Sequence, residues 1–161
     1  MKKYKNHTLK EYSDVLSKRV PVPGGGSAGA LTAALGASLI SMVANYSIDR
    51  GSPKPIEKEI CDILKESEEI RERLLDLVDL DAEAYLEVVK ARRESPAKKK
   101  VALKKARQVP MEVCQLCYRA VDLMPYLVKY GNPYLMSDIE VASEMLLAAF
   151  RSALINVEIN Q

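Results

Sequence analysis

The feature that most constrains this chain is a proline- and glycine-rich turn that runs directly into a long uncharged segment. The turn reads Pro21-Val22-Pro23-Gly24-Gly25-Gly26, and no charged residue occurs between Ser27 and Ile48. Three consecutive glycines are too flexible to form a stiff element. The segment that follows, AGALTAALGASLISMVANYS, has helical composition. The sequence therefore predicts a glycine turn that opens the N-terminus of a helix.

Such a helix start has two interpretations. The first backbone N–H groups of a helix have no partner inside the helix, and the helix dipole is positive there, so an anion or a polar ring edge can bind. Alternatively, Ser27 is only an N-cap and the glycines only form a turn. From this stretch alone we favour the second interpretation.

The uncharged segment is expected to be the central helix of a helical core. Small or weakly polar residues recur along it at helical spacing, and such a face permits close approach of another backbone. These residues are Ser27, Ala30, Ala34, Ala37, Ser38, Ser41 and Asn45, with Gly29 and Gly36 a heptad apart. Larger apolar residues oppose them, so we expect burial all round. A membrane span is the rival interpretation, but Gly, Ser, Thr and Asn dilute the segment and no second hydrophobic stretch accompanies it.

Composition excludes several classes of protein. The 161 residues indicate one domain, 1–161, and a formal net charge of +2 with no Trp and one Phe gives no reason to expect nucleic-acid binding. The N-terminus lacks the apolar region of a signal peptide, so we expect a cytosolic protein without a membrane partner. Cys61, Cys114 and Cys117 are odd in number, which argues against a disulfide framework. The only histidine, His7, is remote from them in the sequence, and we assign no metal.

The rest of the chain keeps a helical period. We expect a short helix over 8–19, one very long helix or two end to end over 56–93, and a helix over 97–130 with a kink at Pro110 and a break or bend at Pro125. A last helix is expected over 134–160, with Val141, Met145, Leu146, Ala149, Leu154 and Ile155 buried. No stretch alternates with period two. The prediction is an all-α, up-and-down bundle of about five helices, two of them long, and apolar residues spread widely around these helices favour a homodimer.

Polar residues inside apolar helical patterns are the candidates for chemistry. Asp79 and Asp81 lie in LVDLDAEAY, and only Asp81 has the spacing to share a face with the core positions around it. A desolvated carboxylate has a raised pKa and suits general acid–base catalysis, although a carboxylate at the bundle edge, paired with a basic residue, is an equal alternative. Asp138 is expected in the first turn of the last helix, where it suits the helix dipole. The amides of Asn156 and Asn160 could hold a ligand ring or another backbone.

Five segments together carry a resemblance to a known family. These are PVPGGGSAGALTAALGASLISMVAN, DLDAEAY, VPMEV, GNPYLMSDIEVA and ALINVEIN. In their order and spacing they resemble the cyclodeaminase family, which comprises the C-terminal domain of formiminotransferase-cyclodeaminase and the related bacterial methenyltetrahydrofolate cyclohydrolases. The resemblance implies an all-helical, dimeric, cytosolic enzyme that acts on the one-carbon bridge of a tetrahydrofolate derivative.

The resemblance also implies roles for individual residues. The acidic residue of the family's DAEAF-like segment falls on Asp81, which is then the general acid or base. Gly24, Gly25, Gly26 and Ser27 are expected to approach the pterin or its one-carbon unit, and Asn132, Ser137 and Asp138 to line the opposite wall. The substrate already carries an electrophilic carbon, so neither a metal nor a separate cofactor is expected. The cluster Lys98, Lys99, Lys100, Lys104 and Lys105 is by default a solvated face, and attraction of a polyglutamate tail is a further interpretation.

Two departures keep alternative functions open. The family's basic stretch after the central helix is replaced here by Ile48-Asp49-Arg50-Gly51-Ser52-Pro53-Lys54, and family sequences continue beyond the INVEIN segment. Our first expectation is hydrolysis of 5,10-methenyltetrahydrofolate to 10-formyltetrahydrofolate. The alternatives are a formimino-tetrahydrofolate cyclodeaminase, which releases ammonia, and a catalytically weakened homologue that binds folate or a protein partner.

Overall fold

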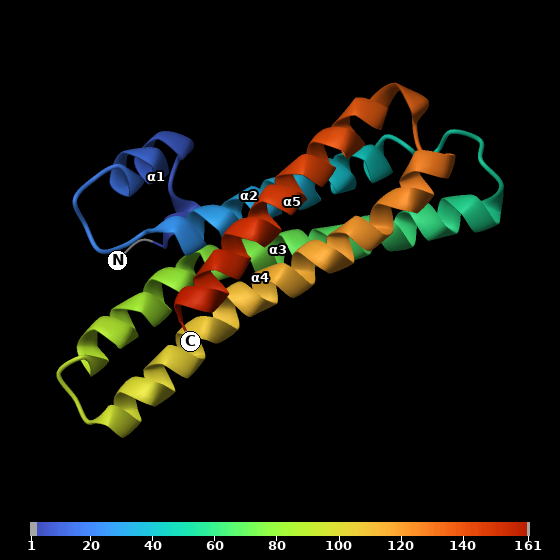
Figure 1. Ribbon diagram of the computed structural model, residues 1–161. Helices are drawn as coiled ribbons and strands as arrows, with labels where there is room; N and C mark the ends of the chain where they lie inside the picture. The colour runs from blue at the N-terminus through green and yellow to red at the C-terminus, as the bar shows by residue number, and fades with distance from the viewer. Residues whose placement is uncertain (1–2, 161) are drawn as a thin grey trace.

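The computed structural model describes residues 3–160 and contains only helices and turns in that range (Figure 1). Its elements are η1 (Tyr4–Asn6), α1 (Leu9–Leu16), α2 (Gly25–Asn45), α3 (Lys54–Ala91), α4 (Pro96–Tyr130), η2 (Pro133–Leu135) and α5 (Met136–Ile159). The four longer helices run up and down beside one another, and α1 lies at one end. The prediction of an all-α bundle of five helices, with two long ones, is confirmed.

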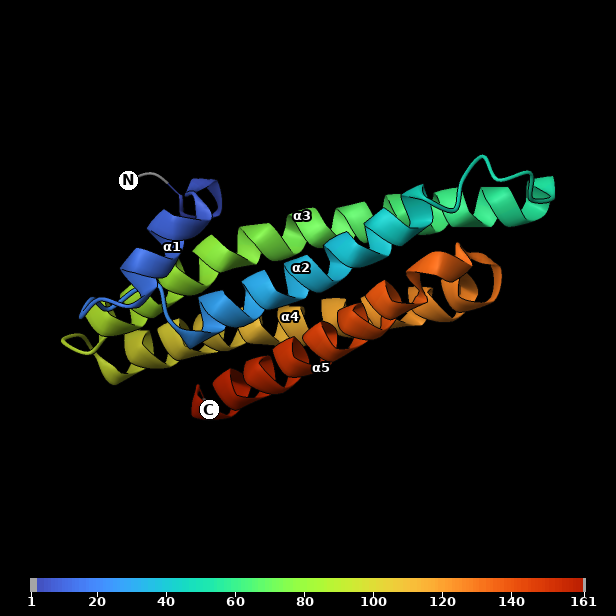
Figure 2. The same cartoon turned by 90° about the horizontal axis from the view of Figure 1, so that it is seen from above.

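Helix α2 lies at the centre of the bundle, with α3 on one side and α5 on the other (Figure 2). Most of its small residues are buried, and Ala30, Ala33 and Ala37 are fully buried, whereas Ser38 is half-buried and Asn45 is exposed. By length and composition α2 could cross a membrane, but most of it is buried inside the bundle. We therefore interpret α2 as the core helix that the sequence predicts.

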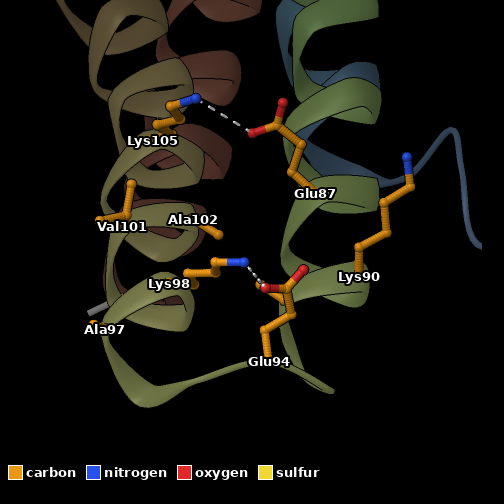
Figure 3. Close-up of a pocket in the computed structure, with 9 residues that line it drawn as sticks. Glu87, Lys90, Glu94, Ala97, Lys98, Val101, Ala102 and Lys105 are labelled. Carbon is orange, nitrogen blue, oxygen red and sulfur yellow. Dashed lines mark ion pairs between the residues drawn. The ribbon is translucent and has the colours of Figure 1, made fainter.

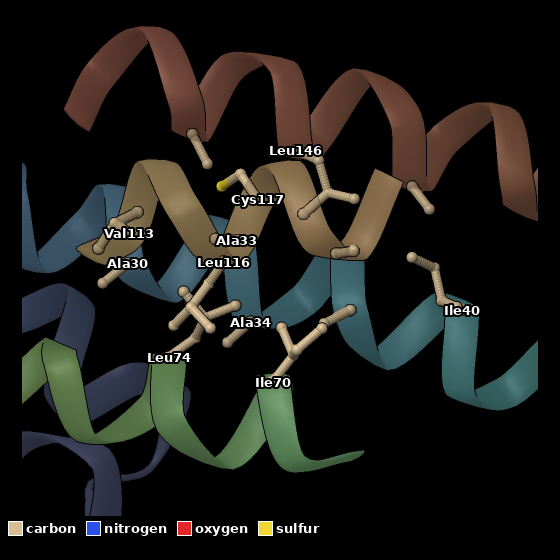
Figure 4. Close-up of a cluster of buried hydrophobic side chains, with 14 of the residues drawn as sticks. Ala30, Ala33, Ala34, Ile40, Ile70, Leu74, Val113, Leu116, Cys117 and Leu146 are labelled. Atoms are coloured by element: carbon tan, nitrogen blue, oxygen red, sulfur yellow. The ribbon is translucent and has the colours of Figure 1, made fainter. Parts of the chain in front are cut away.

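The small-residue face of α2 brings its backbone close to α5. A Cβ atom on Gly36 would lie 2.9 Å from Leu146 Cγ, whereas a Cβ on Gly29 would meet Ser152 Cβ at an ordinary 3.5 Å. The main core runs along the bundle and contains Ile40 of α2, Leu74 of α3, Leu116 of α4 and Leu146 of α5 (Figure 4). The expected close approach along α2 is confirmed, and α5 is the helix that makes it.

The two longest helices, α3 and α4, are each continuous from end to end. Helix α3 is a single helix of 38 residues, and α4 runs unbroken for 35 residues through Pro110 and Pro125, so the chain does not break at Pro125, where we expected a break or bend. Each proline removes one backbone donor. Side-chain packing of α4 against both α3 and α5 compensates for those missing bonds.

Burial on α5 and α2 is less complete than predicted. Val141, Leu154 and Ile155 were expected in the core, but they are 50%, 43% and 57% exposed. Leu35 of α2 is also exposed, although we expected α2 to be buried all round. The four longer helices cover only part of one another, so each outward face is left open.

The α3–α4 hairpin extends beyond the other helices and has a small core of its own. Val88 and Ala91 of α3 pack there against Ala102 and Ala106 of α4, in a cluster separate from the main core. Figure 1 shows this end of the hairpin projecting past α2 and α5. The tip of the hairpin is therefore held by contacts between α3 and α4 alone.

The N-terminal residues cover α3 near its middle. Thr8 caps α1 with a capping box, in which the Thr8 N–H donates to the Glu11 carboxylate and the Glu11 N–H donates to Thr8 Oγ1. The backbone N–H of Tyr4 donates to Asp79 Oδ1 over 2.6 Å. Asp79 is therefore only 6% exposed, which corrects our expectation that only Asp81 of this pair faces inward. The N-terminal segment, whose position the helical period of α3 does not reveal, buries Asp79.

A matched pair of substitutions tests the α2–α5 contact. Gly36→Ala places a methyl group against Leu146, and we expect overpacking to lower the free energy of unfolding by about 1–3 kcal/mol relative to Gly29→Ala. Gly29→Ala should be neutral or stabilising by up to about 1 kcal/mol, because alanine favours a helix over glycine. Urea unfolding followed by circular dichroism measures both. Equal stability of the two variants would contradict the close approach.

Candidate functional site

A cavity of about 280 Å³ opens at the N-terminal end of α2. Its walls come from the glycine turn, the second half of α3, the first half of α4 and the end of α5, and they are formed by Pro21, Val22, Gly24, Gly25, Gly26, Asp81, Ala84, Tyr85, Val88, Ala106, Asn156, Ile159 and Asn160. These segments meet because α2 begins at the level of the bundle where α5 ends. The cavity therefore joins the two most specific sequence features, the glycines and Asp81.

The start of α2 is built to receive the carboxylate of Asp81. Gly24 is the N-cap, so Ser27 is the third residue of the helix, and our interpretation of Ser27 as the N-cap is wrong. A Cβ atom on Gly26 would collide with Asp81 Oδ1, whereas a Cβ on Gly25 would meet nothing. The backbone N–H of Ser27 donates to the Asp81 carboxylate. Glycine is thus required at position 26 so that the carboxylate can lie against the helix end.

The electrostatics of Asp81 differ from those of a surface carboxylate. Desolvation by burial raises the pKa of Asp81 above its ordinary value, and the Ser27 N–H partly opposes this shift. Among residues 3–160, no Lys or Arg forms an ion pair with Asp81. The alternative in which Asp81 is a paired carboxylate at the bundle edge is therefore not what the structure shows. A desolvated, unpaired carboxylate in a cavity is suited to accept and return a proton near neutral pH.

A buried hydrogen bond ties the N-terminal helix to this site. The Tyr12 hydroxyl and Ser27 Oγ lie 3.0 Å apart, and both residues are buried. Burial is also the main cause of the raised pKa of Tyr12. Tyr12 therefore positions the first turn of α2, one residue from the glycine that contacts Asp81.

Asn156 and Asn160 lie one turn apart on the cavity wall. Each side-chain amide nitrogen donates to the backbone carbonyl four residues earlier, at Ser152 and Asn156 respectively. Within the described residues, neither side-chain oxygen takes part in a hydrogen bond between protein groups. Two acceptor oxygens are therefore available to a ligand, as the sequence had left open.

The GNP segment does not line this cavity within one chain, which corrects our expectation for Asn132, Ser137 and Asp138. The Asn132 N–H donates to Ser47 Oγ over 2.8 Å, just beyond the C-terminal end of α2. Helix α2 has 21 residues, so this point is about 30 Å from the glycine turn. Asn132 also caps η2, and Asp138 lies in the first turn of α5. Asn132 therefore closes the α4–α5 connection onto α2, and Ser137 and Asp138 lie in the first turn of α5 at that same end, away from Asp81.

The cysteines take no part in the cavity. Burial raises the pKa of Cys117 to about 12, and Cys61 lies exposed on α3. Residues 3–160 contain no group of three or more His, Cys, Asp or Glu placed to hold a metal ion. Cys117 is buried within α4, and Cys114 is half-buried there.

Sequence reasoning missed several members of the site. Tyr85 is partly exposed and lines the cavity one turn after Asp81, a position that we did not assign to the site. That spacing was a usable signal, because residues four apart share a helix face. Ala106 and Ile159 reach the cavity only through the packing of α4 and α5, and no local pattern marks them.

Comparisons with known proteins agree with this geometry. The family model for formiminotransferase-cyclodeaminase matches residues 8–161. The chain belongs to the formiminotransferase-cyclodeaminase family. A methenyltetrahydrofolate cyclohydrolase from Methylorubrum extorquens is 34% identical over 96% of this chain and 79% of the relative. The crystal structure of a formiminotetrahydrofolate cyclodeaminase from Thermotoga maritima has a TM-score of 0.93 at 35% identity, covering 97% of this chain and 79% of that one.

Longer family members contain the same region. The formimidoyltransferase-cyclodeaminase of Gallus gallus is 30% identical over 88% of this chain, but the match covers only 28% of that protein. The resemblance inferred from the five sequence segments is thus confirmed at the level of the family.

The raised pKa of Asp81 makes a prediction about stability. The folded chain binds the proton of Asp81 more tightly than the unfolded chain, so protonation of Asp81 increases the free energy of unfolding. This contribution to stability is fully present below the ordinary pKa of 3.8. It is lost as the pH rises through the folded-state pKa. Asp81→Asn removes the buried charge, so this variant should be more stable than wild type at neutral pH, with the difference shrinking as the pH falls. Urea unfolding between pH 4 and pH 8 measures this.

Asp76→Asn is the matched control on the same helix. Lys5 lowers the pKa of Asp76 through a hydrogen bond. Its contribution is therefore present above the ordinary pKa and is lost as the pH falls through the lowered value. Asp76→Asn should not be stabilising at neutral pH. Destabilisation by both substitutions at neutral pH would mean that Asp81 also has stabilising partners.

Proposed function

We propose that this chain is a methenyltetrahydrofolate cyclohydrolase, which converts 5,10-methenyltetrahydrofolate into 10-formyltetrahydrofolate. The observation that carries the proposal is Asp81, a desolvated carboxylate held against the Gly26 backbone in a cavity. The Methylorubrum relative, which this chain matches over most of both lengths, favours hydrolysis over deamination. The substrate class, a tetrahydrofolate derivative, fits the names of the relatives on both sides of the family.

The charge of the substrate complements the cavity. The bridging carbon of 5,10-methenyltetrahydrofolate is part of an amidinium cation, and Asp81 has no competing cationic partner among the described residues. A bound cation lowers the pKa of a neighbouring carboxyl group, so Asp81 becomes ionised when the substrate enters. The carboxylate is then ready to act as a base.

Hydrolysis follows in three proton transfers. Asp81 accepts a proton from a water molecule as the oxygen attacks the bridging carbon, which forms a neutral tetrahedral adduct. The loss of the substrate's positive charge raises the basicity of the ring nitrogen and the proton affinity of Asp81 together. Asp81 gives this proton to N5 as the bond from the carbon to N5 breaks. The hydroxyl group of the adduct loses its own proton to Asp81, which leaves the formyl group on N10. Release of that proton to solvent returns Asp81 as a carboxylate.

Other cavity residues bind and orient the substrate in this proposal. The edge of a pterin ring presents N–H donors, and the free side-chain oxygens of Asn156 and Asn160 are acceptors on one wall. Gly24, Gly25 and Gly26 allow the ring to approach the backbone at the start of α2. The reaction requires no separate cofactor and no metal, because the electrophile is supplied by the substrate.

A second candidate is the formimino-tetrahydrofolate cyclodeaminase reaction. It is favoured by the likeness to the Thermotoga cyclodeaminase, with a TM-score of 0.93. In that reaction Asp81 would give a proton to departing ammonia while the ring closes. The third candidate, a binding protein without turnover, rests on the altered sequence from Ile48 to Lys54.

We also propose that the active form is a cytosolic homodimer, with no nucleic-acid or membrane partner. Large apolar side chains are exposed along α4 and α5, and they surround a shallow apolar hollow between these helices. They include Tyr118, Val121 and Leu147. Exposed apolar surface of this kind commonly forms contacts between subunits.

The dimer predicts a defined response to a charged residue on that surface. Leu147→Glu should convert a dimer into a monomer, because a carboxylate would have to be desolvated in the interface. Sedimentation equilibrium measures the mass of both forms. Leu9→Glu, on the exposed side of α1, is the control and should stay dimeric. A wild-type monomer at micromolar concentration would contradict the proposal.

The reaction itself is tested by the absorbance of 5,10-methenyltetrahydrofolate in a buffer where spontaneous hydrolysis is slow. Wild type should remove the absorbance faster than the blank, and Asp81→Asn should lower kcat by about 100-fold to 10,000-fold, the usual contribution of a general base. Gly26→Ala should also lower kcat, because the added methyl group displaces the carboxylate. Gly29→Ala, one turn further along the same helix, should retain activity.

Each outcome separates the candidates. Wild-type activity that persists in Asp81→Asn would reject Asp81 as the base but keep the reaction. If wild type matches the blank, hydrolysis is rejected. Release of ammonia from the formimino substrate would then identify the cyclodeaminase, and tight folate binding without turnover would identify the weakened homologue.

A further inference from the structure

Two tyrosines of the N-terminal segment hold the glycine turn from both sides. The Tyr4 hydroxyl donates to the Val22 carbonyl over 3.2 Å, just before the three glycines. The Tyr12 hydroxyl lies 3.0 Å from Ser27 Oγ, just after them. Both rings are buried, and they pack edge to face with their centroids 6.4 Å apart. Because consecutive glycines are flexible by themselves, these two hydrogen bonds restrict how the turn can move.

Ser27 connects the N-terminal segment to Asp81. The side-chain oxygen of Ser27 is hydrogen-bonded to Tyr12, and its backbone N–H donates to the Asp81 carboxylate. Ser27 is fully buried, and among residues 3–160 Tyr12 is the one hydrogen-bond partner of its hydroxyl. A displacement of Ser27 therefore weakens the hydrogen bond that opposes the desolvation of Asp81.

The other elements around Asp81 contribute no charged group to the cavity wall. Helix α2 has no charged residue. Helices α4 and α5 contribute Ala106, Asn156, Ile159 and Asn160. On α3, Tyr85 is the other titratable residue of the wall, and Asp79 faces Tyr4 instead. Tyr12 of α1 approaches Asp81 from the far side of Ser27.

The lysines of α4 that face α3 pair with glutamates further along the hairpin. Figure 3 shows Lys105 beside Glu87 and Lys98 beside Glu94, in a hollow between the two helices. The Lys105 Nζ to Glu87 Oε2 distance is 3.7 Å. Within the described residues, an ionised Asp81 is therefore stabilised by the Ser27 N–H and the positive end of the α2 dipole rather than by a cation.

Tyr12 stays protonated over the range in which a carboxyl group titrates. Burial raises the pKa of Tyr12 above its ordinary value of 10.0, the Ser27 hydrogen bond opposes this shift, and the charge of Asp81 adds to it. The Tyr12 hydroxyl is therefore a neutral group in a fixed place while Asp81 gains and loses its proton.

We propose that Tyr12 is a positioning residue for the general base, because its hydroxyl fixes Ser27 with the backbone N–H directed at the Asp81 carboxylate. The role of Asp81 as a base rests on the proposed function. Tyr12→Phe leaves the Ser27 hydroxyl buried without a partner, so the first turn of α2 relaxes away from α3. The hydrogen bond from the Ser27 N–H then weakens, and Asp81 keeps its proton up to a higher pH.

Two measurements on the full chain test this proposal. An NMR titration of the Asp81 carboxyl carbon, assigned by its absence from Asp81→Asn, gives the pKa of this group in the folate-free protein. The pH dependence of kcat/KM for 5,10-methenyltetrahydrofolate, corrected for the blank at each pH, reports the ionisation of the base in the free enzyme. The variants are Tyr12→Phe, Ser27→Ala and the two combined.

Tyr4→Phe is the matched control. It removes a buried hydroxyl from the same N-terminal segment, but that hydroxyl bonds to the Val22 carbonyl and not to Ser27. The Tyr4 backbone N–H, which bonds to Asp79, is retained. Unfolding in urea measures the stability of every variant.

We expect Tyr12→Phe to raise the pKa of Asp81 by roughly 0.5–1 unit, the size that corresponds to weakening one hydrogen bond. The rising limb of kcat/KM should move to higher pH by the same amount, which lowers kcat/KM about threefold to tenfold on the acidic side of the profile. Ser27→Ala should cause a similar shift. Adding Tyr12→Phe to it should cause no further shift, because the two side chains act as one unit. Tyr4→Phe should leave the pKa of Asp81 in place.

A Tyr12 that serves packing alone gives a different result. Tyr12→Phe would then lower the free energy of unfolding without moving the pKa of Asp81, and this overturns the proposal. A lowered pKa, additive shifts in the combined variant or an equal shift in Tyr4→Phe overturns it as well. If Tyr12→Phe does not fold, Ser27→Ala removes the same hydrogen bond from its other side and decides the shift.

The NMR titration does not depend on turnover, so it separates this inference from the proposed function. If wild type hydrolyses nothing, the proposed reaction fails, and a raised pKa of Asp81 in Tyr12→Phe still supports the link through Ser27. An unchanged pKa overturns the link even if wild type is an active cyclohydrolase.

Discussion

The structure depends on how closely the backbone of α2 can approach its neighbours. Gly36 against Leu146 sets the α2–α5 distance, and Gly26 against Asp81 sets the position of α3 at the start of α2. Both contacts exist because these residues have no side chain. The absence of a side chain therefore allows close packing of the core at Gly36 and forms the candidate active site at Gly26.

The site retains an unfavourable arrangement that the fold has to support. Among the described residues the desolvated carboxylate of Asp81 has no cationic partner, and the Ser27 N–H and the positive end of the α2 dipole offset part of the cost of its desolvation. The N-terminal segment contributes to this support. Tyr12 fixes Ser27, and Tyr4 bonds to Asp79, two residues before Asp81 on α3. The hydrogen bonds of Tyr12 and Tyr4, made outside the cavity, thus help to offset the cost of desolvating the Asp81 carboxylate.

The parts of the fold and the site that follow from local sequence patterns could be predicted, whereas the parts that depend on contacts between distant segments could not. The uncharged glycine-led helix and the inward spacing of Asp81 are local patterns, and Asn156 with Asn160 stood out among apolar residues. The burial of Asp79 depends on residues 75 positions away, and Ala106 reaches the cavity through helix packing, so neither has a local signal. Within one chain Asn132 and Asp81 lie at opposite ends of α2, and motif order along the sequence does not give the distance between the two ends of a helix.

The separate small core of the α3–α4 hairpin has a consequence for how such a protein can diversify. Val88, Ala91, Ala102 and Ala106 hold the projecting tip without help from α2 or α5. Substitutions on the outer faces of that tip leave the main core unchanged, so they can accumulate with little penalty in folding. The outer faces of the hairpin could therefore vary among related bundles while the glycine turn at the start of α2 stays the same.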